Sequence, residues 1–70
     1  MYKKIYTLVR RGERSKRWMF ECSDDSRGLA AFSLRTHVAA GYKKDDLKII
    51  STVATKAAIK AAIAALNTKL

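Results

Sequence analysis

The stretch "KKIYTLVRRGERSKRWMFEC", residues 3–22, decides the fold of this chain. Residues 3–9 are rich in β-branched and aromatic side chains, and residues 17–22 alternate apolar side chains with longer or charged ones, as strands do. Gly12 lies in the charged stretch between them. The pattern predicts a β-hairpin over about residues 3–22. Both faces of the first strand are partly apolar, so periodicity alone leaves open which face is buried.

The rest of the chain predicts two helices and one further strand. The polar stretch "SDDS", residues 23–26, supplies N-cap residues for a helix over about residues 26–40, which Gly41 ends,. A third strand follows over about residues 47–54, and Thr55 caps a second helix over about residues 56–66,. The order β-β-α-β-α predicts a single small α+β domain, residues 1–70, with a three-stranded, mainly antiparallel sheet and both helices packed on one side.

Both predicted helices have apolar surface that the hairpin alone does not cover. The first helix has one apolar face, and Leu29 and Phe32 fall on roughly the opposite side,. They either meet another element or form an apolar interface with a partner. The second helix carries alanines over most of its own surface and lacks a polar face. We expect these alanines to pack on the first helix or on a second copy of the chain, so a homodimer is one of two alternatives.

Positive charge dominates the composition. The 70 residues include 15 Lys or Arg and 6 Asp or Glu, a net charge of +9. The excess lies at the two ends of the chain, and the middle is nearly neutral. Such a field attracts polyanions, which are nucleic acid, an acidic protein or an anionic membrane surface. We expect no membrane partner, because neither helix joins a lysine-rich face to large apolar anchors.

The hairpin connection "RRGERSKR", residues 10–17, is the first candidate binding element. Arginine forks bind phosphate oxygens, although a charge run can also be a well-solvated loop. Further candidates for phosphate contact are two lysines one turn apart at the start of the last helix and two lysines at the start of the first strand,. A tyrosine that faces outward is a candidate for base stacking. The predicted contacts to nucleic acid or an acidic partner are Arg10, Arg11, Arg14, Lys16, Arg17, Lys3, Lys4, Tyr6, Lys56 and Lys60. The aromatic residues Trp18 and Phe20 are expected in the core, because so small a domain needs its large apolar side chains inside.

Motifs for chemistry are missing from the sequence. Cys22 is the only cysteine, so no internal disulfide can form, and with His37 it lacks a recognisable third catalytic member,. The two Asp pairs at residues 24–25 and 45–46 occupy cap or turn positions that favour Asp in any case. We therefore expect no enzyme activity, no cofactor and no metal site. With no signal peptide or membrane-spanning run, we expect a cytoplasmic protein.

Two hypotheses of function remain. In the first, the chain is a small nucleic-acid-binding or regulatory protein that contacts DNA or RNA phosphates through the hairpin. In the second, it is an inhibitor or adaptor that docks on an acidic surface of a larger protein, and Leu29 and Phe32 supply the apolar anchors that protein interfaces need. In type, such a compact basic chain resembles the accessory proteins of phages.

Overall fold

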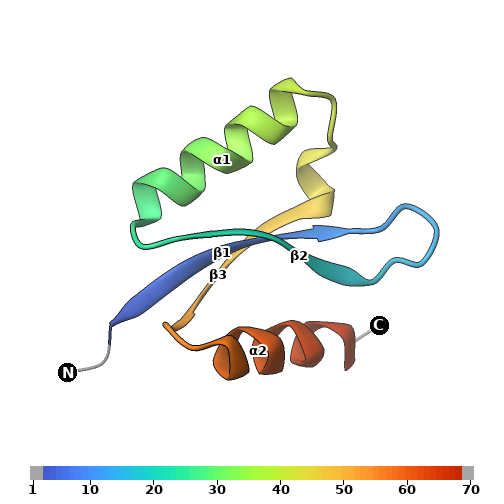
Figure 1. The fold of residues 1–70 in the computed structure, drawn as a ribbon. Helices are drawn as coiled ribbons and strands as arrows, with labels where there is room; N and C mark the ends of the chain where they lie inside the picture. Colours follow the sequence, from blue (N-terminus) through green and yellow to red (C-terminus); the bar gives the residue numbers. More distant parts are fainter. Residues whose placement is uncertain (1–2, 69–70) are drawn as a thin grey trace.

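The computed structural model describes residues 3–68 (Figure 1). Its elements are β1 (Lys4–Arg11), β2 (Trp18–Asp24), α1 (Arg27–Ala39), a short 3₁₀ turn η1 (Lys44–Asp46), β3 (Leu47–Val53) and α2 (Lys56–Thr68). The strands form one sheet in the order β2-β1-β3, and both neighbouring pairs are antiparallel. The predicted α+β class, the element order and the antiparallel sheet are confirmed.

Local signals place the helix ends where the sequence predicted them. Ser26 caps α1, since its side chain accepts a hydrogen bond from the Leu29 N–H at 3.1 Å,. The helix ends at Ala39, two residues before Gly41, whose φ of 110° is a conformation that glycine adopts at little cost,. Bonds from Gly41 N–H to the Val38 carbonyl and from Tyr42 N–H to the His37 carbonyl complete this C-terminal cap,.

The second helix is capped in the same way. The Thr55 hydroxyl accepts a hydrogen bond from the Ala58 N–H at 3.1 Å, so the predicted N-cap of α2 is also confirmed. At the other end of the helix, Asn67 holds the start of β2. Its side-chain oxygen accepts from the Trp18 N–H at 2.6 Å, and its amide donates to the Trp18 carbonyl at 3.1 Å. These two hydrogen bonds tie the C-terminal end of α2 to the start of β2.

A β-bulge in β2 changes the facing of the hairpin. Leu8 pairs with Cys22 and Val9 pairs with Phe20, so Glu21 is the extra residue,. The strict alternation of the sequence would put Phe20 and Cys22 on one face. In the structure Phe20 shares the face of Val9, and Cys22 shares the opposite face with Leu8.

The two helices pack against different faces of the sheet. On the α1 face, the Arg27 guanidinium lies over the Tyr6 ring, and Ser33 donates to Asp24. On the other face, Phe20 borders α2. Figure 1 shows the sheet between α1 and α2. We expected both helices on one side of the sheet. Because β1 carries apolar side chains on both faces, each face is instead covered by a different helix.

The core is small and centred on β1. Thr7, Leu8 and Val9 are fully buried, and Ala30 of α1 and Leu47 of β3 join them. The Thr7 hydroxyl is satisfied by the Ser23 hydroxyl at 3.0 Å, so it is buried without an energetic penalty. No residue of α2 is fully buried, and most of its alanines face solvent. They do not meet α1, which leaves the homodimer as the untested alternative.

Candidate nucleic-acid interface

The hairpin loop has a defined shape set by backbone hydrogen bonds. Gly12 N–H donates to the Arg17 carbonyl, and Lys16 N–H donates to the Gly12 carbonyl, both at 2.9 Å. The Ser15 hydroxyl accepts from Arg17 N–H at 3.3 Å. A Cβ at Gly12 would lie 2.6 Å from the Ser15 hydroxyl oxygen, so a larger residue there would force the Ser15 side chain to move. Lys16 closes the loop with a φ of 59°, the left-handed region,.

Arg10 and Arg11, at the end of β1, are engaged inside the molecule. Arg10 Nε lies 3.1 Å from a Glu21 carboxylate oxygen. Arg11 Nε and Nη2 lie 3.2 and 3.1 Å from one oxygen of Asp46, and Nη2 also donates to the Asp45 carbonyl at 3.3 Å. Their side chains are only 34% and 32% exposed. These two arginines join the hairpin to its neighbours, and their charge is already balanced.

Aromatic rings add to this anchoring. The Arg10 guanidinium lies 5.5 Å from the centre of the Tyr42 ring, and that of Arg11 lies 5.3 Å from the Trp18 ring, both within the range of cation–π attraction. Phosphate contact by either arginine would compete with an ion pair and with a ring contact.

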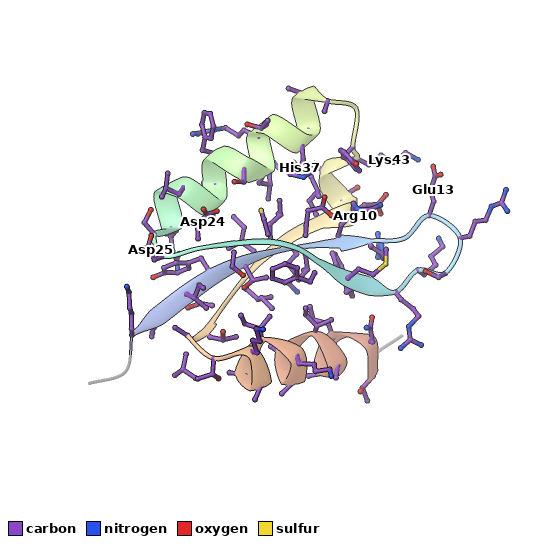
Figure 2. All side chains as sticks on the ribbon, viewed as in Figure 1. Arg10, Glu13, Asp24, Asp25, His37 and Lys43 are labelled. Carbon is purple, nitrogen blue, oxygen red and sulfur yellow. The ribbon has the colours of Figure 1, made fainter. Side chains whose placement is uncertain are left out.

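The three other predicted loop cations are free. Arg14, Lys16 and Arg17 are exposed, and in residues 3–68 no carboxylate lies within 4.0 Å of their charged groups. Figure 2 shows side chains of this loop extending away from the sheet. The loop tip is therefore the part of the predicted cluster that is available to an anionic partner.

A shallow hollow separates the hairpin loop from the segment that follows α1. One part, about 240 Å³, is lined by Arg10, Arg11, Tyr42 and Lys43 among others, and an adjoining part is about 290 Å³. Glu13 and Asp46 line both parts, and Figure 2 shows Arg10, Glu13 and Lys43 at this end of the molecule. The mixed charges make the hollow a poorer phosphate site than the exposed tip.

The predicted accessory contacts lie elsewhere. Lys3 and Lys4 are exposed at the start of β1, and Lys3 forms only a solvent-exposed pair with Asp25 at 3.9 Å. Lys4 and Arg11 are seven steps apart along the extended strand β1, a distance of about 23 Å. Tyr6 is half-buried, and the Arg27 guanidinium lies over its ring, 5.4 Å from the ring centre. The structure therefore does not bring these residues together with the loop.

Lys56 and Lys60 are exposed on α2, on the face of the sheet opposite α1. With Phe20, Ile59 and Ile63 they line an apolar hollow of about 220 Å³. Phe20, expected in the core, is 54% exposed. The sequence pointed to the two lysines of this site but not to Phe20, because it placed that side chain in the core.

The predicted apolar interface residues are exposed. Leu29 is 53% and Phe32 is 62% exposed, on the side of α1 opposite its buried Ala30. No further element of residues 3–68 covers this face, so an internal contact is excluded for the described residues, and an interface with a partner stays a prediction.

Glu21, at the bulge, is the centre of a small polar cluster. His37 Nδ1 lies 2.7 Å from the Ser33 carbonyl, and Nε2 lies 3.3 Å from the second Glu21 oxygen. The hydrogen bond from Arg10 lowers the pKa of Glu21 from its ordinary value, with help from His37 and against the opposing effect of burial,. The cluster thus stabilises the ionised carboxylate.

This pKa shift predicts an acid-dependent loss of stability. Because the folded pKa lies below that of the unfolded chain, the contribution of Glu21 is complete above about pH 4.3 and is lost as the pH falls through the lower folded value. Urea unfolding should show that Glu21→Gln lowers the midpoint at pH 7 and that this difference shrinks toward pH 3. Glu13→Gln, in the exposed loop, is the control, and an equal pH dependence there would contradict the prediction.

No arrangement for chemistry emerges among the described residues. Within residues 3–68, no three His, Cys, Asp or Glu side chains are grouped as metal ligands would be. Cys22 is half-buried and free. Neither of the 13-residue helices α1 and α2 is long and apolar enough to cross a membrane.

Three comparisons were made, with known protein families, with curated proteins and with solved structures, and none finds a match. Function is therefore inferred from the geometry and charge of this chain.

Proposed function

We propose that this protein binds nucleic acid through the tip of its hairpin, where Arg14, Lys16 and Arg17 contact phosphates. One observation carries the proposal. These three cations are exposed on a loop of defined shape and have no carboxylate partner in the described structure, whereas neighbouring Arg10 and Arg11 are paired internally. Unpaired guanidinium and ammonium groups form charge-assisted hydrogen bonds with phosphate oxygens.

The shape of the loop and the overall charge both support this function. The loop projects beyond the end of the sheet (Figure 1), so it can approach a groove or a single strand without steric conflict. Its internal hydrogen bonds reduce the entropy that ordering on binding would cost. The net charge of +9 adds a long-range attraction for polyanions and accelerates encounter,.

The structure specifies a selective test. The double variant Arg14→Ser/Arg17→Ser removes two free charges and leaves the ion pairs of Arg10 and Arg11 intact. It also spares Lys16 and its left-handed backbone. The matched control, Arg35→Ser/Lys44→Ser, removes two exposed charges outside the loop. Binding of labelled duplex DNA, single-stranded DNA and RNA would be measured across a salt series.

We expect wild type to bind at about 0.15 M salt and the loop variant to lose about 10-fold or more in affinity. On duplex DNA, the slope of log K against log salt should become shallower by about 2, since each phosphate contact contributes about 0.9. The control variant should keep most of the wild-type affinity and most of the wild-type salt slope. If the two variants lose equal affinity, general charge explains binding, and the assignment to the loop fails.

An acidic protein surface is the second candidate partner, favoured by the exposure of Leu29 and Phe32. Large apolar side chains are typical anchors of protein interfaces. The observation that discriminates is the wild-type salt series. Binding to nucleic acid only at very low salt would favour this candidate, and Phe32→Ala would then be compared with wild type against acidic protein partners.

A further inference from the structure

We propose that the hollow between β2 and α2 is a base-stacking site for single-stranded nucleic acid, formed by Phe20, Ile59 and Ile63 with Lys56 and Lys60 at its rim. This inference rests on the proposed function and names the form of nucleic acid. A base would stack on Phe20, and the phosphates beside it would contact the two lysines.

The composition of the hollow indicates this ligand. Its lining is apolar apart from the two lysines, and Phe20 is 54% exposed there. Exposed aromatic rings next to cations bind single strands, because every base has a face that can stack. Lys56 and Lys60 are one helical turn apart, so both reach the same rim,.

Charge complementarity favours an anionic ligand. No residue from Leu47 to Thr68 is acidic. Glu21 follows Phe20 in sequence but bonds to Arg10 and His37, whose contacts lie on the α1 face. Lys56 also begins α2, whose dipole is positive at this end,. An anion at the rim therefore meets no nearby negative side chain from the lining.

The size of the hollow argues for one base of a longer chain. At about 220 Å³ it is smaller than the about 300–1,000 Å³ typical of sites for free small molecules. The start of β2 connects it to the hairpin loop. Arg17 and Phe20 are three extended residues apart, about 10 Å, so one strand can contact both. A rigid duplex would keep its bases stacked and could not use Phe20.

The test compares two phenylalanines. Phe20→Leu keeps the apolar volume and removes the aromatic face, and Phe32→Leu, on the other side of the sheet, is the matched control. Binding would be measured on a labelled oligothymidine and on duplex DNA, after the thermal midpoint of each variant has shown that it is folded. The variant Lys56→Ser/Lys60→Ser tests the contribution of the two lysines. Poly-L-glutamate, a polyanion that has no bases, tests whether binding depends on charge alone.

We expect Phe20→Leu to weaken oligothymidine binding about 5- to 100-fold, the range of one stacked base, without changing the salt slope. Phe32→Leu should have no such effect, and duplex binding should be unaffected by either. The lysine variant should reduce the single-strand slope by about 1.4, at about 0.7 per contact.

An unchanged affinity in Phe20→Leu, or an equal loss with poly-L-glutamate, overturns the stacking site. If the Arg14→Ser/Arg17→Ser variant still shows its loss in the same assays, the proposed function survives that result. If wild type binds neither form of DNA nor RNA near physiological salt, both proposals fail.

Discussion

Leu8→Ala is expected to destabilise this protein by about 3 kcal/mol and to leave a substantial fraction of the chain unfolded at 25 °C. Leu8 is fully buried in the central strand, and truncating a buried leucine costs about 2.7–5 kcal/mol through lost transfer energy and the cavity left behind. A core in so short a chain rarely supplies more than about 3–5 kcal/mol in total. The variant therefore loses most of its free energy of unfolding.

Urea unfolding followed by circular dichroism would measure this change. Leu29→Ala removes the same atoms from a side chain that is 53% exposed, so its cost should stay below about 1 kcal/mol. A similar cost at both positions would mean that Leu8 is not the centre of the core. Any loss of nucleic-acid binding by the Leu8 variant should follow its unfolded fraction.

The elements and their ends could be predicted because their signals are local. Ser26 and Thr55 cap helices through hydrogen bonds to residues three positions later, and Gly41 ends α1 through its own backbone conformation. Each signal lies within a few residues of the structure that it determines. The β-branched and aromatic composition of residues 3–9 and the alternation of residues 17–22 likewise predict the hairpin without reference to the rest of the chain,.

The facing of the elements could not be predicted in the same way. The apolar side chains of β1 point to both faces, and only the packed structure shows that each face has its own helix. The bulge at Glu21 is a one-residue insertion that turns Cys22 to the face opposite Phe20. Nothing in the local sequence marks it.

For the same reason, the sequence could not show which cations of the candidate site are paired inside the molecule and which are free. The sequence does not distinguish the five cations of residues 10–17 from one another. In the structure they differ, because two of them are paired with residues that are distant in sequence. Arg10 meets Glu21, and Arg11 meets Asp46, 35 residues further along the chain. Such pairs depend on tertiary structure, which a count of charges does not contain. The three cations without such partners are the ones that the proposed function uses.

Ala30→Leu is expected to be the second most damaging of the substitutions considered, at about 2–3 kcal/mol. Ala30 is the one fully buried residue of α1, at the place where the helix approaches the sheet, and alanine there permits the close packing that covers the Leu8 face. A larger side chain must adopt a strained rotamer or push the helix away, since packed interiors have few voids. Displacing α1 would also disturb the contacts of His37 with Glu21.

The control for this substitution lies on the same helix. Ala39→Leu adds the same atoms at an exposed position, where leucine has nearly the helix propensity of alanine, so stability should change by no more than about 0.5 kcal/mol. Urea midpoints of both variants would be compared with wild type. Equal midpoints for the two variants would show that α1 is loosely packed and that the small size of Ala30 is not required. A selective loss at Ala30 would show that α1 needs an alanine there in order to cover β1, the strand that leads directly into the binding loop.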